Sequence, residues 1–190
     1  MNETTIGQGE PGGPDGRLGD RPIASVVYDE GVIRDRVCAM GREISEAYSA
    51  EDRLLVLGLL KGSFLFMADL VRKLTVPLHV DFMVASSYGD GMLSSGDVRL
   101  LYEPPSELEG RSVLLVEDIV DSGATLSRLV PMLGERGAAR VDVCALLHKR
   151  LPTVDVDVRW VGFDAPNSFL VGYGLDHAED FRHLPYIASL

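Results

Sequence analysis

The chain has 190 residues, of which 46% are hydrophobic, so it suits one ordinary domain with a sizeable core. Its 29 acidic and 18 basic side chains give a net charge of −11, which argues against a nucleic-acid surface because phosphate contacts need clustered Lys and Arg. No stretch approaches the ~18 apolar residues of a membrane helix, and the N-terminus carries no export signal pattern. We therefore expect a cytoplasmic protein with no membrane contact.

The first 22 residues differ in composition from the rest. Six of the first twenty are glycine, Pro11 and Pro14 interrupt them, and apolar side chains are sparse. Such a segment cannot bury enough surface to offset its conformational entropy. We predict a disordered tail over 1–22 and one folded domain over 23–190.

Strand and helix patterns alternate along the predicted domain. Apolar positions from Ile33 to Tyr48 recur at helical spacing, with Asp29 as a candidate N-cap. The apolar run 54–60 predicts a strand buried on both faces. The elements that follow are a helix over 64–74 that Ser63 could cap, strands over 78–85 and 98–102 separated by a mobile loop, a strand over 112–116, a helix over 123–136, and strands over 141–147 and 158–163. This alternation predicts a parallel sheet covered by helices on both faces.

The most informative segment follows the strand over 112–116. Glu117 and Asp118 come at once, then Asp121, then Ser122-Gly123-Ala124-Thr125 at a helix start. Ligands of open α/β sheets bind beyond the carboxyl ends of the strands. Helix N-terminal amides and hydroxyls attract a phosphate, whereas carboxylates accept hydrogen bonds from a ribose diol or hold Mg²⁺. Each residue alone would suit a solvated loop or a plain cap, but the combination predicts a sugar-phosphate site.

The run from Val116 to Thr125 resembles the phosphoribosyl-pyrophosphate motif of the type I phosphoribosyltransferases. Further segments narrow the resemblance to the hypoxanthine-guanine phosphoribosyltransferases: Leu60-Lys61-Gly62, Ser86-Ser87-Tyr88-Gly89, Val161-Gly162-Phe163, and the runs 171–176 and 182–186. The resemblance covers 23–190 in family order and spacing. It implies a parallel twisted sheet flanked by helices, with a small hood built from terminal segments.

The resemblance also implies an activity. Members of that family transfer 5-phosphoribosyl from phosphoribosyl pyrophosphate to N9 of hypoxanthine or guanine, which gives IMP or GMP and pyrophosphate in purine salvage. They use Mg²⁺ and commonly form dimers or tetramers, so we expect the same here.

Matching motifs assign roles to individual residues. Asp121 matches the acid/base group beside purine N7, and Glu117 and Asp118 match the residues on the ribose hydroxyls. The 5-phosphate cradle matches Ser122, Gly123, Ala124 and Thr125. Lys61 and Gly62 match a pyrophosphate loop that often has a cis peptide before the lysine.

The remaining roles fall on other segments. Ser87 and Tyr88 match a loop that closes over the reaction. Lys149 matches the lysine on the purine 6-oxo group, Phe169 the aromatic that stacks on the base, and Leu170 the position whose backbone contacts it. Arg182 matches a pyrophosphate contact, and Glu117, Asp118 and Asp176 match the metal contacts. Taken singly, Lys149 and Arg182 would suit surface cations and Phe169 a core residue.

The sequence departs from common family patterns near the base site, at His148-Lys149-Arg150 and Leu170, which leaves the purine preference open. Two other functions compete with the transferase hypothesis. One is an RNA-binding regulator on the same fold, which the acidic composition does not favour. The other is a phospho-receiver domain, in which 113–118 would be the first strand and its acidic pair, although only 72 residues follow Asp118.

The cysteines and histidines indicate no metal site. Cys38 and Cys144 fit buried reduced thiols better than a disulfide. His177 and His183 lack a third ligand at metal-binding spacing and suit polar surface or hydrogen-bonded positions.

Overall fold

The computed structural model describes residues 16–18, 21–87, 98–102, 107–151 and 156–190. Its centre is a six-stranded sheet in the order β4-β3-β2-β5-β6-β7. Five strands are parallel, and the edge strand β4 runs antiparallel to β3. The strands are β2 (Leu55–Leu60), β3 (His79–Ser87), β4 (Val98–Tyr102), β5 (Ser112–Val120), β6 (Arg140–His148) and β7 (Trp160–Asp164).

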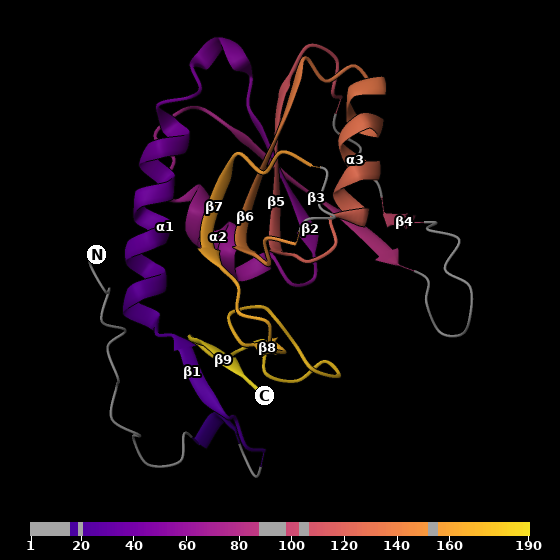
Figure 1. Ribbon diagram of the computed structural model, residues 1–190. Helices are drawn as coiled ribbons and strands as arrows, with labels where there is room; N and C mark the ends of the chain where they lie inside the picture. The colour runs from indigo at the N-terminus through magenta and orange to yellow at the C-terminus, as the bar shows by residue number, and fades with distance from the viewer. Residues whose placement is uncertain (1–15, 19–20, 88–97, 103–106, 152–155) are drawn as a thin grey trace.

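Helices cover both faces of this sheet, as predicted (Figure 1). On one face, α1 (Glu30–Ser45) and α2 (Phe64–Val71) pack against strand residues such as Val56 and Leu114. On the other face, α3 (Ala124–Glu135) packs against Leu57 and Leu115. Alternate residues of one strand thus enter opposite cores, which explains the unbroken apolar runs in the sequence.

The sequence predicted an N-cap residue for each of the helices α1 and α2. Asp29 caps α1, because its Oδ1 accepts a hydrogen bond from the Val32 amide at 2.9 Å. Ser63 precedes α2 but does not cap it with its side chain. Its hydroxyl donates to the Leu59 carbonyl at 2.7 Å instead, so Ser63 is the N-cap residue, as predicted, but its side chain makes no capping hydrogen bond.

A small antiparallel sheet forms the hood, in the order β1-β9-β8. Its strands are β1 (Ser25–Tyr28), β8 (Leu170–Val171) and β9 (Ile187–Ser189). The hood lies beyond the end of the main sheet toward which β7 runs (Figure 1). Terminal segments therefore build it, as the resemblance implied.

Two expected boundaries were wrong. β5 does not end at Val116 but continues to Val120, because residues 117–120 keep their pairing with β6. Ser86 and Ser87 do not begin a loop but end β3, where they pair with Arg99 and Val98 of β4. Residues 88–97, including Tyr88, lie outside the described residues.

The predicted tail over 1–22 lies largely outside the described residues as well. Of the part that is described, Gly16–Leu18 form a 3₁₀ helix, η1, and the Arg17 carbonyl lies 3.3 Å from His183 Nε2 in the hood. The tail boundary at residue 22 therefore stays a prediction.

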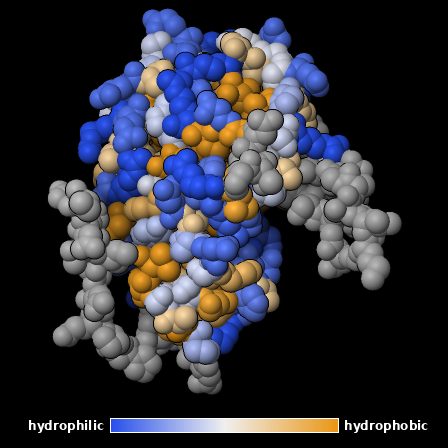
Figure 2. Space-filling view, viewed as in Figure 1, coloured by the Kyte–Doolittle hydropathy of each residue, from blue (hydrophilic) through white to orange (hydrophobic). Residues whose placement is uncertain are grey.

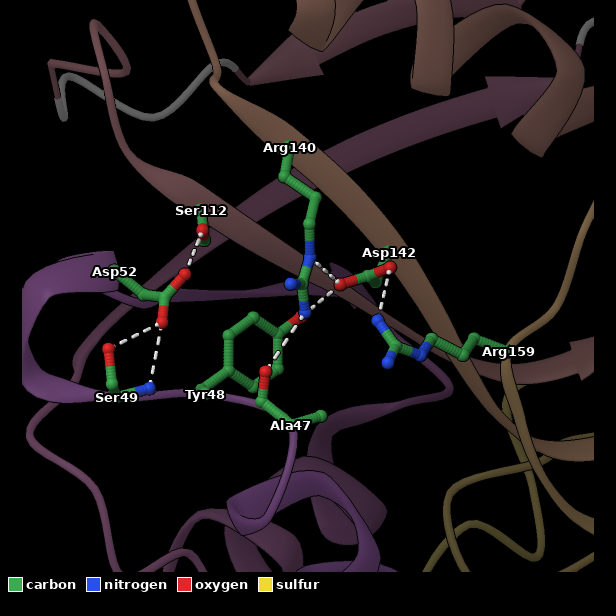
Figure 3. Close-up of polar contacts among 8 residues, drawn as sticks. All are labelled: Ala47, Tyr48, Ser49, Asp52, Ser112, Arg140, Asp142 and Arg159. Atoms are coloured by element: carbon green, nitrogen blue, oxygen red, sulfur yellow. Dashed lines mark hydrogen bonds and ion pairs between the residues drawn. The ribbon is translucent and has the colours of Figure 1, made fainter.

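A polar cluster centred on Asp142 ties the end of α1 to the amino-terminal edge of the sheet (Figure 3). The Asp142 carboxylate accepts hydrogen bonds from Tyr48 Oη at 2.6 Å, Arg140 Nε at 2.5 Å and Arg159 Nη1 at 3.2 Å. Arg140 also stacks on the Tyr48 ring. Since one carboxylate joins three donors from separate segments, this Asp142 cluster fixes how α1 sits on the sheet.

Much of the outer surface is hydrophilic, as expected of a chain in which 25% of the residues are charged (Figure 2). Over α1 and along the upper rim it is largely hydrophilic, and hydrophobic residues gather near the centre and over the hood (Figure 2). Within the described ranges, no helix combines the length and apolar character needed to cross a membrane. Both cysteines are free thiols, with Cys144 buried and Cys38 partly buried.

Candidate active site

Glu117 and Asp118 lie inside the carboxyl-terminal half of β5 rather than in a loop. Glu117 pairs in register with Ala145 of β6, so the strand backbone fixes its position. Its Oε2 is buried and has no hydrogen-bond partner in the described part of the chain. Burial, and then the neighbouring Asp118 charge, raise the Glu117 pKa well above its ordinary value. A buried carboxyl oxygen without a donor is costly, and a ligand hydroxyl would relieve that cost.

Asp118 lies against the turn that follows β2. A Cβ on Gly62 would come within 2.5 Å of Asp118 Cγ and closer still to its Oδ2, so any side chain there would displace the Asp118 carboxylate. The peptide bond before Lys61, between Leu60 and Lys61, is cis, as the resemblance implied. Burial raises the Asp118 pKa to about 6, against the lowering effects of backbone hydrogen bonds and of Arg182.

The hood contributes the opposite wall of the site. Arg182 Nη2 lies 2.8 Å from Asp176 Oδ1, and Arg182 Nη1 donates to the Gly174 carbonyl at 2.8 Å. Arg182 Nε is buried and finds no acceptor among the residues described. Gly174 lies directly against the Gly62 carbonyl oxygen, which brings the hood onto the β2–α2 turn.

A cavity of about 400 Å³ lies between these walls. Apart from Leu59 and Leu60, every residue that lines it was predicted to bind substrate or metal: Lys61, Gly62, Glu117, Asp118, Thr125, Asp176 and Arg182. Among the residues that the structure describes, two buried side-chain atoms lack a hydrogen-bond partner, Glu117 Oε2 and Arg182 Nε, and both residues belong to this lining. The fold therefore brings together residues from four separate motifs.

The predicted phosphate cradle begins α3. Gly123 is the N-cap residue with φ 74°, a left-handed conformation that glycine adopts at little cost. Ser122 Oγ lies 3.4 Å from the Ala124 amide nitrogen. The first amides of a helix have no intrahelical acceptor, so this turn presents free donors and a partial positive charge.

Asp121 and Lys149 form an ion pair beside the cradle. Lys149 follows β6, and its amide donates to the Val120 carbonyl at 3.0 Å. Its Nζ donates to Asp121 Oδ2 at 2.7 Å. The predicted acid/base group, Asp121, and the predicted purine-binding cation, Lys149, therefore lie next to each other, so a purine bound there could contact both side chains.

Phe169 is 56% exposed, so it is not a core residue. Its ring meets His177 edge-on, with the ring centroids 5.4 Å apart. Leu170 is buried in β8 and pairs with Ser189. An exposed aromatic held from one side can stack on a planar base.

Sequence reasoning missed two residues of this region. Glu179 accepts hydrogen bonds from Lys61 Nζ at 3.1 Å through both carboxylate oxygens, and its Oε2 lies 3.4 Å from Arg182 Nη2. His177 supports Phe169. Both occupy a turn in which Ala178 and Glu179 have positive φ, and no local pattern signalled these contacts.

The three predicted metal contacts come from β5 and the hood. Among the residues that the structure describes, no three His, Cys, Asp or Glu side chains stand close enough to hold a metal ion by themselves. Mg²⁺ usually keeps several waters and takes only one or two carboxylates together with substrate phosphates. The Glu117, Asp118 and Asp176 carboxylates suit that mode of binding.

Comparisons with known proteins agree with this geometry. The family model "Phosphoribosyl transferase domain" matches residues 32–178. The chain is 46% identical to a hypoxanthine phosphoribosyltransferase of Salmonella typhimurium over 167 residues, covering 87% of this chain and 94% of the relative. It is 43% identical to a hypoxanthine-guanine phosphoribosyltransferase of Dictyostelium discoideum over 169 residues, with the same two coverages.

Solved structures give the same result. A hypoxanthine-guanine phosphoribosyltransferase from Bacillus anthracis is similar with a TM-score of 0.84 and 37% identity, covering 89% of this chain and 99% of that one. A hypoxanthine phosphoribosyltransferase from Staphylococcus aureus has a TM-score of 0.84 and 35% identity, with coverages of 88% and 91%. The phospho-receiver hypothesis is therefore wrong. The chain belongs to the hypoxanthine phosphoribosyltransferases, within the type I phosphoribosyltransferase family.

Proposed function

We propose that this protein transfers the 5-phosphoribosyl group from phosphoribosyl pyrophosphate to N9 of hypoxanthine or guanine, releasing pyrophosphate. The observation that carries the proposal is the cavity lined on one side by the buried, unpartnered Glu117 and on the other by Arg182. A ligand that fills it must donate to a carboxylate and accept from a guanidinium. A ribose diol joined to a pyrophosphate has both features.

The substrate then has a defined orientation. Its ribose hydroxyls donate to Glu117 and Asp118, and its 5-phosphate accepts from the amides and hydroxyls between Ser122 and Thr125. Its pyrophosphate faces Lys61 and Arg182, which offset the negative charge that grows as the bond to the sugar carbon breaks. This orientation points the sugar carbon toward Asp121 and Lys149.

The carboxylates of Glu117, Asp118 and Asp176 would hold Mg²⁺, which takes one or two protein carboxylates together with substrate phosphates. When bound, it supplies positive charge to the ribose hydroxyls and to the departing pyrophosphate. A buried carboxyl with a raised pKa, as at Glu117, gains from such a cation because the cation favours its ionised form.

The purine site follows from the Asp121–Lys149 pair. As the base enters, the Lys149 ammonium donates to the 6-oxo oxygen, and Asp121 accepts the proton at the ring nitrogen. An adenine amino group would set donor against donor and leave a buried group unpaired. Phe169 stacks on the ring, and the Leu170 backbone contacts its edge. Ser87, which ends β3, and Tyr88, the next residue in the sequence, match family positions in a loop that closes over the reaction, and such closure would keep water from the sugar carbon.

The test is nucleotide formation from Mg²⁺, phosphoribosyl pyrophosphate and each purine in turn. Asp121→Asn should lower kcat about 100-fold or more while phosphoribosyl pyrophosphate still binds, since general acid/base catalysis contributes about 10²–10⁴-fold. Lys149→Ala should raise the KM for the purine and reduce the discrimination against adenine. Asp35→Asn, which changes an exposed acid on α1, is the matched control and should leave the rate unchanged. Full turnover in Asp121→Asn would remove that residue from the acid/base role.

Two further expectations accompany this function. Self-association as a dimer or tetramer and a cytoplasmic location are usual for the family, and sedimentation velocity and cell fractionation test them. The RNA-binding alternative gains no support from a chain with a net charge of −11, because a phosphate backbone is bound by clustered Lys and Arg.

A further inference from the structure

A second cavity lies at the opposite edge of the main sheet, among the segments that precede β2, β3 and β5. It has a volume of about 230 Å³. Its lining is Ala50, Arg53, Leu54, Pro77, Leu78, His79 and Arg111. The proposed transferase reaction uses none of these residues.

Arg111 is a buried cation whose charge is not balanced. Only 6% of this residue is exposed. Its Nε donates to the Arg53 carbonyl at 2.9 Å and its Nη2 to the Leu54 carbonyl at 3.3 Å, so both acceptors are neutral. Burial, and then the positive charge of Arg53, lower the Arg111 pKa. The two guanidiniums therefore repel each other across one cavity, and an anion between them would remove that cost.

Arg53 stands at the mouth of this cavity in a left-handed conformation, with φ 50° and ψ 45°. Its Nη1 reaches only the Glu109 carbonyl, at 3.5 Å. No ion pair joins Arg53 or Arg111 to a carboxylate within the described ranges. In a chain with a net charge of −11, two cations that share a cavity without an acid are unusual.

The acids nearest in sequence are engaged elsewhere. The Asp52 carboxylate accepts from Ser49 and Ser112, both at 3.0 Å or less (Figure 3). The Glu109 carboxylate lies against Gly137, at the far side of its own turn. Neither neutralises the arginines, so the positive charge is left for a ligand.

We propose that the cavity between Arg53 and Arg111 binds a phosphate group, either as inorganic phosphate or as a small phosphate monoester. The hydrogen bonds above leave Nη1 of Arg111 and Nε and Nη2 of Arg53 as donors for a tetrahedral oxyanion, and His79 also lines the cavity. The volume is below the ~300–1,000 Å³ typical of drug-sized ligands and suits a phosphate group. The site lies at the amino-terminal ends of the strands, so its occupant does not compete with substrate at the carboxyl ends.

Crystals soaked in tungstate, a heavy tetrahedral oxyanion, provide the direct test. We expect an anomalous peak between the Arg53 and Arg111 guanidiniums, besides any peak at the 122–125 cradle. Arg53→Asn should abolish the first peak and keep the second, since Asn tolerates the left-handed conformation but carries no charge. Its rate without added phosphate should equal that of the wild type, because Arg53 contacts no catalytic residue.

Calorimetric titration with inorganic phosphate measures the same site in solution. The wild type should bind phosphate at this site at least tenfold more tightly than Arg53→Asn does. A cradle peak without an arginine peak would overturn the proposal, as would equal phosphate binding by both proteins. A peak in bromide soaks but not in tungstate would overturn the phosphate assignment. Arg111→Lys, which keeps the charge but not the fork, should weaken binding; if it does not fold, Arg53→Asn alone decides.

Discussion

Substitution of Gly62 by alanine tests whether the Asp118 carboxylate must lie where the β2–α2 turn places it. The added Cβ would come within 2.5 Å of Asp118 Cγ. Ordinary contact between carbon atoms requires about 3.5 Å, so one group must move by at least roughly 1 Å, because Asp118 Oδ2 lies closer still. Gly62 does not have a positive φ, so the backbone itself accepts alanine and the effect is a steric one on Asp118.

A displacement of that size has a predictable cost. Misplacement by about 1 Å reduces rate by around 100-fold when a group positions the reacting centre. That factor corresponds to a loss of about 2.7 kcal/mol of transition-state stabilisation in kcat/KM, at 1.36 kcal/mol for each tenfold change. The three heavy atoms nearest to the added Cβ all belong to the Asp118 side chain of β5 and none to the backbone, so we expect the fold to persist.

Steady-state formation of IMP, with phosphoribosyl pyrophosphate as the varied substrate, measures the effect. Gly134→Ala is the matched control, because nothing lies within 4 Å of its added Cβ on α3. That variant should keep full activity and gain about 0.5–1 kcal/mol of stability from a better helix former. If Gly62→Ala retains kcat/KM within threefold of the wild type, the placement of Asp118 against this turn does not matter for the reaction.

Three other changes probe separate features. Burial raises the Asp118 pKa from 3.8 to about 6, so its contribution to stability is present below pH 4 and is lost as pH rises through 6. Urea unfolding of the wild type relative to Asp118→Asn, without Mg²⁺, should show a relative loss of up to about 3 kcal/mol between pH 4 and 7, and parallel curves would contradict this. Glu179→Gln should lower the KM for phosphoribosyl pyrophosphate by up to about fivefold, since Glu179 competes for Lys61 through an exposed ion pair that solvent screens; an unchanged KM would refute the competition. Asp142→Asn should cost about 1–3 kcal/mol of unfolding free energy with kcat unaltered, and an unaltered urea midpoint would show that the Asp142 cluster contributes little.

The sheet and its helices were predictable because their signals are local. Strands buried on both faces give unbroken apolar runs, and α1 repeats its apolar residues at helical spacing up to the Asp29 cap. The end of β5 was not predictable from the same signal. Glu117 and Asp118 look like the start of a loop, yet pairing with β6 continues past them, since Ile119 lies opposite Leu147.

The hood and its contacts depend on pairings that no short window of sequence contains. β8 has only two residues, and Ser25 of β1 bonds Ser189 of β9 across 164 positions. Motif order nevertheless identified Asp176 and Arg182 as site residues, and both line the cavity. The contacts of Glu179 and His177 were not predicted, because they depend on the positive φ of Ala178 and Glu179, which no short sequence pattern indicates.

The distance in sequence between β1 and β9 bears on how the protein emerges from the ribosome. Strands β2 to β7 are all synthesised before β8 and β9, so the main sheet can condense while the partners of β1 are still missing. Such a nascent chain already carries Glu117, Asp118 and Lys149 but not Arg182. In the proposed reaction Arg182 would face the departing pyrophosphate, so we expect catalytic competence only after the segment that carries Arg182 has been synthesised and the hood has formed.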